Sequence, residues 1–224
     1  QHFFAGELER RRTEPTDDLL THLLQATIDE PGVDPRPLDV PEILSILSQL
    51  MTAGNETTTK LCSEMLLQLG RNKHEWTKLQ ADPGRAPRVV EEALRMSTPA
   101  QGLYRVAMKD TEIDGVPIPR GAKVFAAFSA ANRDPAVFPD PHRFDPDRPN
   151  VRDHLAFGGG VHFCIGAPLA RLESIVALEH LVRRWDYFTL CAENEFTYHA
   201  TYMLRGLEHL YLDFTVADRK QTTP

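Results

Sequence analysis

The sequence predicts a mainly α-helical fold with small β-sheets. Three stretches show helical periodicity, with apolar residues three or four positions apart: residues 39–70, 89–95 and 168–185. Residues 104–108 alternate in polarity as a strand does, and residues 123–126 predict a second strand beyond turns that contain Gly and Pro. Helices therefore make up most of the predicted structure, and the strands form only small sheets.

The first third of the chain predicts three helices. Residues 1–12 end in a charged run that is typical of the solvated face of a surface helix. Residues 17–27 place leucines at helical spacing behind acidic residues, which indicates a short amphipathic helix. Three prolines and a glycine make residues 30–37 a loop. Asp39 and Glu42 then have the spacing of a capping box, which begins a long helix of about thirty residues, or ~45 Å.

The remaining elements follow from local patterns. Residues 131–147 are rich in proline and predict an irregular meander. Residues 209–214 alternate in polarity and predict a terminal β-hairpin whose turn lies at residues 203–206. We expect residues 217–224 to form a frayed tail.

Length and composition restrict the class of protein. The chain has 224 residues, of which 42% are hydrophobic and 25% charged, and this length suits one large domain or two small ones. The net charge of −7 argues against nucleic acid as a partner. No apolar run approaches the ~20 residues of a membrane span, and no signal peptide is recognisable, so we expect no membrane partner and a cytoplasmic location. The three cysteines lack paired spacing, which argues against a disulfide framework.

The most informative stretch is residues 157–173, which read FGGGVHFCIGAPLARLE. Its glycines can adopt backbone angles closed to other residues and let the chain pass close to a flat ligand. Pro168 suits the first turn of a helix, so Cys164 lies just ahead of a helix N-terminus. Free N–H groups and the helix dipole stabilise a thiolate there. Such a thiolate is either a soft metal ligand or a nucleophile.

This stretch resembles, at six positions, the haem-binding loop of the cytochrome P-450 family, the haem-thiolate monooxygenases: Phe157, Gly158, Gly160, His162, Cys164 and Gly166. The resemblance implies the family's fold and a b-type haem (iron protoporphyrin IX) with Cys164 as axial iron ligand. It also implies that His162 and Arg105 bind the haem propionates and that Phe157 lies beside the sulfur.

Residues 53–57, at the centre of the long helix, resemble the family's oxygen-binding motif [AG]-G-x-[DE]-T. Small and polar residues make this part of the helix weak and suit close approach by a ligand. The resemblance implies that Ala53 and Gly54 lie against the distal haem face. It makes Glu56 and Thr57 the acid–alcohol pair that delivers protons for cleavage of dioxygen.

A third motif, E-x-x-R, places Glu92 and Arg95 on one face of the helix at residues 89–95. In the family this pair is buried and joined by an arginine of the meander, which we assign to Arg143. Because removal of one partner from a buried charge network is costly, we expect Glu92, Arg95 and Arg143 to serve folding and haem incorporation.

The resemblance spans nearly the whole chain but covers only the C-terminal half of the family's fold. We therefore expect residues 1–224 to be the C-terminal haem-binding part of a single domain, without the amino-terminal half: the long central helix, the E-x-x-R helix, the meander, the Cys loop and the helix under the haem. The pocket residues that are present indicate a small apolar organic substrate.

The resemblance implies an oxidoreductase that uses dioxygen. No flavin or iron–sulfur motif is recognisable, so a ferredoxin and a ferredoxin reductase are the implied electron donors. Two alternatives stay within haem chemistry: a haem-binding fragment without turnover, and a peroxygenase, against which the acid–alcohol pair argues. A third is a Cys–His hydrolase or transferase that uses Cys164 and His162, in which a thiol-directed alkylating agent would abolish activity without haem.

Overall fold

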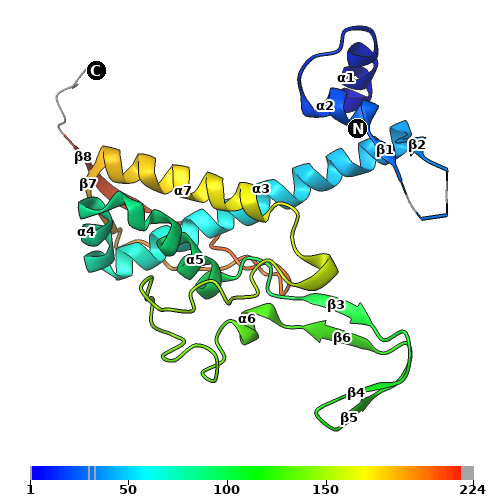
Figure 1. Ribbon diagram of the computed structural model, residues 1–224. Coiled ribbons are helices and arrows are strands. Elements are labelled where there is room, and N and C mark those ends of the chain that lie inside the picture. The colour runs from blue at the N-terminus through cyan, green and yellow to red at the C-terminus, as the bar shows by residue number, and fades with distance from the viewer. Residues whose placement is uncertain (1, 30, 33, 218–224) are drawn as a thin grey trace. The chain divides into compact units, whose positions relative to one another are not determined.

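The computed structural model describes residues 2–29, 31–32 and 34–217, and the chain divides into two compact units. One unit is Gln1–Glu56 and the other is Thr57–Pro224. The helix α3, Val40–Arg71, runs continuously from the first unit into the second, so the weak centre at residues 53–59 does not interrupt it. From residue 218 on, the predicted tail lies outside the described residues (Figure 1).

The first unit contains two helices before α3, namely α1 (His2–Thr13) and α2 (Leu19–Gln25). Two-residue strands, β1 (Thr27–Ile28) and β2 (Arg36–Pro37), pair antiparallel. The strand β1 begins at the end of the predicted helix 17–27, and β2 lies in the predicted loop 30–37. The start of α3 has the predicted capping box. The Glu42 backbone N–H donates to Asp39 Oδ1 at 2.8 Å, and the Asp39 N–H donates to Glu42 Oε2 at 2.8 Å.

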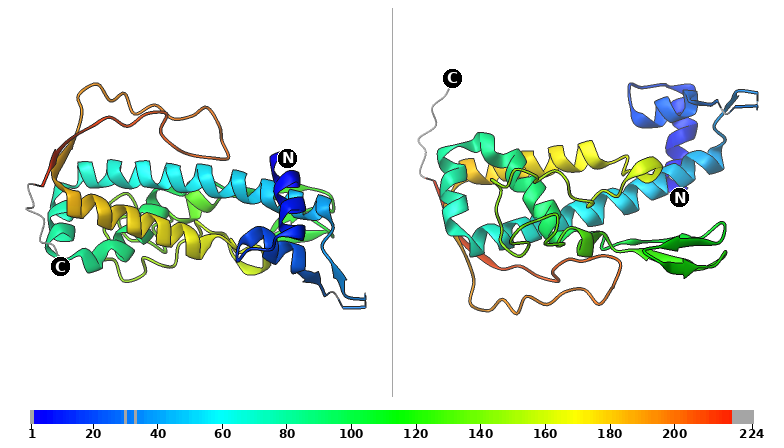
Figure 2. Two further views of the ribbon diagram at one scale, coloured as in Figure 1. Left: turned by 90° about the horizontal axis from the view of Figure 1, so that it is seen from above. Right: turned by 60° about the horizontal axis from the view of Figure 1, so that its bottom comes forward.

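The second unit is built around helices. They are the second part of α3, α4 (Lys73–Ala81), α5 (Ala86–Ser97), α7 (Ala167–Arg184) and the short α6 (Phe128–Ala131). Two 3₁₀ turns, η1 (Pro83–Arg85) and η2 (Gly160–His162), precede α5 and α7. In both views of Figure 2, α7 lies alongside the second part of α3.

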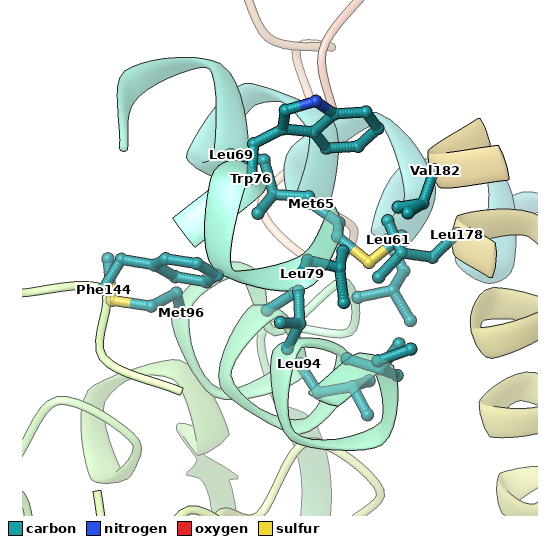
Figure 3. Packing of buried hydrophobic residues seen from close by; sticks show 14 of the residues in the cluster. Leu61, Met65, Leu69, Trp76, Leu79, Leu94, Met96, Phe144, Leu178 and Val182 are labelled. Carbon is teal, nitrogen blue, oxygen red and sulfur yellow. The ribbon is translucent and has the colours of Figure 1, made fainter. Parts of the chain in front are cut away.

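A single apolar cluster holds these helices together. Figure 3 shows Leu61 and Met65 of α3 close to Leu178 and Val182 of α7. In this view Trp76 of α4 lies above them and Leu94 of α5 below. The spacing of four residues in each pair places both members on one face of their helix. At these positions the helical periodicity of the sequence marks a buried face, whereas Leu169 and Leu172 in the first turns of α7 stay exposed.

Three antiparallel strand pairs complete the second unit. They are β3 (Leu103–Val106) with β6 (Lys123–Ala126), β4 (Thr111–Ile113) with β5 (Val116–Ile118), and β7 (Trp185–Leu190) with β8 (Leu212–Val216). The prediction of a mainly α-helical fold with small sheets is confirmed.

The predicted C-terminal hairpin has a different partner strand. The strand β8 begins at Leu212 and pairs with β7, which directly follows α7. The predicted turn at residues 203–206 instead pairs with the chain after α5. The Gln101 N–H donates to the Met203 carbonyl and the Arg205 N–H to the Pro99 carbonyl, both at 2.8 Å. Alternation in the sequence indicates a strand but does not say which strand it joins.

Among the described residues, none of the helices combines the length and the apolar character that crossing a membrane requires.

Candidate functional site

Cys164 lies between the turn η2 and the helix α7, with its side chain exposed. The backbone positions it from both sides. Its N–H donates to the Phe157 carbonyl at 3.0 Å, and its carbonyl accepts from the Ala167 N–H at 3.2 Å. Because α7 begins at Ala167 with Pro168 in its first turn, the thiol lies three residues ahead of a helix N-terminus, as the sequence predicts.

Glycines shape the loop that presents the thiol. Gly158 and Gly160 have φ values of +69° and +63°, in the left-handed region that side chains disfavour. Gly166 needs a glycine less strictly, because a Cβ there would lie 3.8 Å from Cys164 Sγ, an ordinary contact distance. The first two glycines therefore satisfy the turn, and the third leaves room beside the sulfur.

The donor set around Cys164 fits a haem. Among the residues that the structure describes, no group of three or more His, Cys, Asp or Glu could hold a metal ion. A metal on Cys164 would thus have at most two ligands from such side chains and would take the others from a cofactor. The neighbouring side chains Val161 and Ile165 are 97% and 94% exposed, and Leu169 and Leu172 of α7 are also exposed. An open apolar surface next to one thiol suits a flat apolar macrocycle that a soft sulfur ligand holds.

The two predicted propionate ligands are exposed side chains on separate elements. His162 ends the turn η2, and Arg105 lies on β3, opposite Val124 of β6. The Arg105 guanidinium donates to the neighbouring Tyr104 carbonyl at 3.0 Å. Both side chains therefore face solvent, as groups that bind a carboxylate at the rim of a site must.

The predicted acid–alcohol pair lies on α3 where the two units meet in the sequence. Ala53, Gly54 and Glu56 are exposed residues of the first unit, and Thr57, half-buried, opens the second. All four belong to uninterrupted helix, so the motif is presented from regular backbone.

The E-x-x-R pair is fully buried. Arg95 Nε and Nη2 donate to the two carboxylate oxygens of Glu92, each at 2.8 Å, and both side chains have 0% exposure. The other Arg95 nitrogen, Nη1, donates to the carbonyls of Asn132 and Pro141. A buried ion pair is stable only when its remaining donors find partners, and the meander carbonyls provide them.

The assignment of Arg143 to this network is wrong for its side chain, which is 68% exposed and lies 3.8 Å from Asp145. Arg148, with 5% side-chain exposure, takes the position: its Nε lies 3.2 Å from both oxygens of Glu92. Arg143 contributes only its backbone carbonyl, which accepts from Arg95 and Arg148. Arg148 directly follows the predicted meander at residues 131–147, and we include it in the meander from here on. Because this part of the chain is irregular, no periodicity in the sequence says which of its arginines points inward.

A second buried carboxylate, Glu91, was not predicted. Its side chain is 4% exposed and binds His154 and Arg171, which lie on either side of the Cys loop. Burial raises the pKa of Glu91, but hydrogen bonds from His154 and Arg171 lower it by more than burial raises it. The net pKa is about 2. The only hint in the sequence was that Glu91 directly precedes Glu92. The E-x-x-R motif does not specify the residue at that position.

Asn132 is another site residue that sequence reasoning missed. It is 1% exposed; its Nδ2 donates to Thr98 Oγ1 at 2.8 Å and its Oδ1 accepts from the Leu155 N–H at 2.6 Å. It thereby ties the end of α5 to the start of the Cys loop. A single asparagine in a proline-rich stretch carries no sequence signal for this role.

A helical core, a buried E-x-x-R network with a meander arginine, and a glycine-rich loop that presents one cysteine ahead of a helix together define a haem-thiolate class of protein. The chain belongs to the cytochrome P450 family, whose model matches residues 86–198. The expected P450 fold is confirmed by its similarity to solved structures. A cytochrome P450 of Chondromyces apiculatus, CYP109Q5, is 41% identical with a TM-score of 0.89, and covers 97% of this chain and 55% of its own.

Two further relatives give the same picture. The substrate-free CYP150A6 of Mycobacterium marinum is 38% identical with a TM-score of 0.90, over 96% of this chain and 54% of its own. The 6-deoxyerythronolide B hydroxylase of Saccharopolyspora erythraea is 40% identical over 93% of this chain and 51% of its own. The chain thus spans about half the length of the relatives it matches.

Proposed function

We propose that the protein is a haem-thiolate monooxygenase that inserts one oxygen atom of dioxygen into a small apolar organic substrate. The observation that carries the proposal is the exposed Cys164 thiol, held between the Phe157 carbonyl and the start of α7. The cofactor is a b-type haem. A haem held by a cysteine thiolate activates dioxygen, and the thiolate favours O–O cleavage by donating electron density.

The residues of this chain have separate tasks in the proposed reaction. Cys164 provides the sulfur ligand, and His162 and Arg105 bind the propionates as charged hydrogen-bond donors. The Glu56 carboxylate would hold a proton, and the Thr57 hydroxyl would pass it toward the dioxygen substrate. Ala53 and Gly54 keep the helix narrow there. The buried pair Glu92–Arg95, completed by Arg148, maintains the fold on the cysteine side.

The partners belong to the same proposal. A ferredoxin and a ferredoxin reductase supply electrons, since the sequence has no recognisable flavin or iron–sulfur motif of its own. The cytoplasmic location expected from the sequence is part of this proposal. An apolar substrate agrees with the solved relative CYP109E1 of Bacillus megaterium, 34% identical, whose structures include complexes with corticosterone and testosterone.

The test is the absorption spectrum of the reduced, haem-loaded protein with carbon monoxide. We expect the signature of a thiolate ligand in the wild type and its loss in Cys164→Ser. Cys191→Ser is the matched control and should keep the signature, because Cys191 lies at the end of β7, away from the Cys loop in the sequence. A wild type that binds haem without this signature would overturn the proposal.

Turnover separates the monooxygenase from its alternatives. With ferredoxin, reductase and NADPH, a panel of apolar compounds should give substrate-dependent oxidation that falls in Thr57→Ala. Oxidation supported by peroxide alone would identify a peroxygenase. A thiolate signature without either reaction would identify haem binding without turnover.

A further inference from the structure

Glu91 and Glu92 are neighbours on α5 but serve different networks. Glu92 binds Arg95 and Arg148, which ties α5 to the meander. Glu91 accepts from Arg171 Nε at 2.6 Å and Nη2 at 3.1 Å, and its Oε2 lies 2.9 Å from His154 Nε2. Consecutive helical residues point about 100° apart, so the two carboxylates reach different parts of the fold.

His154 has a defined tautomer in this network. Its Nδ1 accepts from the Ala156 backbone N–H at 3.2 Å, so the ring proton belongs on Nε2 and is donated to Glu91. The imidazole side chain is 1% exposed. Both ring nitrogens are therefore used, and the ring cannot turn without breaking two hydrogen bonds.

The two partners of Glu91 lie on opposite sides of Cys164 along the chain. His154 precedes it by ten residues and Arg171 follows it by seven. One buried carboxylate thus holds both ends of the segment 154–171 that presents the thiol. The side chains of Arg95 and Arg148 instead donate to Glu92 and to backbone carbonyls such as those of Pro141 and Pro139, so the Glu92 network reaches this segment indirectly, through Asn132.

Phe157 connects the two partners of Glu91 to Cys164. The Arg171 guanidinium lies over its ring at 4.6 Å from the centroid, and the His154 ring lies 6.2 Å away. The Phe157 carbonyl accepts the hydrogen bond of the Cys164 N–H at 3.0 Å. The residue that positions Cys164 is therefore packed between the two residues that Glu91 binds.

We infer that Glu91 is a positioning residue for the proposed iron ligand, acting on Cys164 through His154, Arg171 and Phe157. The inference rests on the proposed function. Glu91 fixes the distance between the two ends of the Cys loop, and loss of its charge lets the loop widen and the sulfur move. Because movement of the sulfur affects its bond to the iron, loss of the Glu91 charge should change the thiolate signature before it changes the global stability of the fold.

The test compares Glu91→Gln with wild type in the haem-loaded protein. The measurement is the rate at which the reduced carbon monoxide complex loses its thiolate signature in mild denaturant. We expect this rate to rise roughly ten- to hundredfold, which corresponds to loss of one charge-assisted hydrogen bond. Arg171→Lys keeps the positive charge, so its rate should lie between those of wild type and Glu91→Gln. Arg152→Gln is the control, because Arg152 is 76% exposed and lies 4.0 Å from Glu91.

A second measurement decides the inference even if Glu91→Gln does not retain haem. Hydrogen exchange on the haem-free protein should become faster in residues 154–171, including the Cys164 amide, while the second part of α3 and the Glu92 network keep their protection. Equal acceleration across all of these segments would show a general folding role and overturn the inference, as would an unchanged thiolate lifetime. A wild type without any thiolate signature would instead refute the proposed function, and the exchange experiment would still stand.

Discussion

At the scale of single residues, the site depends on buried charges whose partners come from irregular segments. Glu92 is fully buried and receives donors from Arg95 and Arg148, while Glu91 receives them from His154 and Arg171. Buried charges are tolerated only when each polar group has a partner. We therefore expect the contribution of each arginine to the free energy of unfolding to depend on how deeply its side chain is buried, and not on whether it belongs to a sequence motif.

The first prediction contrasts the two meander arginines. Arg148→Ala leaves the Glu92 carboxylate with one arginine fewer in a fully buried setting, so we expect a loss of about 3–5 kcal/mol in the free energy of unfolding. Arg143→Ala removes an exposed side chain and should change stability by less than about 0.5 kcal/mol. Urea unfolding of both variants measures the difference. Similar losses in the two would contradict the assignment of Arg148.

The second prediction concerns the pH dependence that Glu91 confers. Its pKa of about 2 in the folded protein lies below the ordinary value of 4.5, because hydrogen bonds from His154 and Arg171 outweigh burial. A lowered pKa contributes stability that is fully present above pH 4.5 and is lost as the pH falls toward 2. The contribution amounts to about 3 kcal/mol in all.

Other carboxylates titrate in the same range, so the comparison must be with Glu91→Gln. The stability difference between wild type and this variant should be largest near neutral pH and should shrink steadily below pH 4.5. Unfolding by urea at a series of pH values measures it. A difference that stays constant down to pH 3 would show that Glu91 is not held in its charged form.

At the scale of elements, the longest helices were predictable from the sequence, whereas the short helix α4, the strand pair β4–β5 and the irregular segments were not. The periodicity of the long helix and the glycine-rich loop before α7 identified the main helices and the thiol, because both depend on local spacing. The inward position of Arg148 depends on how the irregular chain after α6 folds back on α5. The contacts of Glu91 depend on how His154 and Arg171 of α7 pack against α5. Tertiary packing likewise determines that β8 pairs with β7, so a short stretch of sequence cannot predict this pairing.

The third prediction tests the backbone of the Cys loop with two neighbouring glycines. Gly160 has φ +63°, whereas Gly159 has φ −164°, and a Cβ at either position would meet no atom within 4 Å. Gly160→Ala should therefore cost about 1–2 kcal/mol from backbone strain alone. Gly159→Ala meets neither strain nor a clash and should be close to neutral.

Unfolding of the haem-free variants separates the two, since no ligand then contacts the loop. Equal effects of Gly159→Ala and Gly160→Ala would mean that the turn at residues 160–162 does not need a left-handed residue.

At the scale of the whole molecule, the second unit leaves an apolar surface open beside its thiol. The buried cluster of this unit includes Ala156 at the start of the loop but neither Val161 nor Ile165, which are almost fully exposed. Contiguous exposed apolar surface is uncommon on a monomer and marks a binding site or an interface. In the proposed function, the haem covers this surface.

The last prediction follows from that surface. Ile165, adjacent to Cys164, is 94% exposed, and burying such a side chain stabilises a complex by about 1.5–3 kcal/mol. Ile165→Asp should therefore weaken haem binding by roughly ten- to hundredfold or more, because the carboxylate would also lose its hydration. Ile113→Asp is the matched control: Ile113 is 56% exposed on β4, in a different hairpin.

Haem titration followed by tryptophan fluorescence gives the haem affinities of both variants. The unfolding midpoint should rise with haem concentration in the control but much less in Ile165→Asp. Equal affinities would mean that the cofactor does not rest on the apolar side chains around Cys164, and that their exposure reflects an interface with another part of the protein.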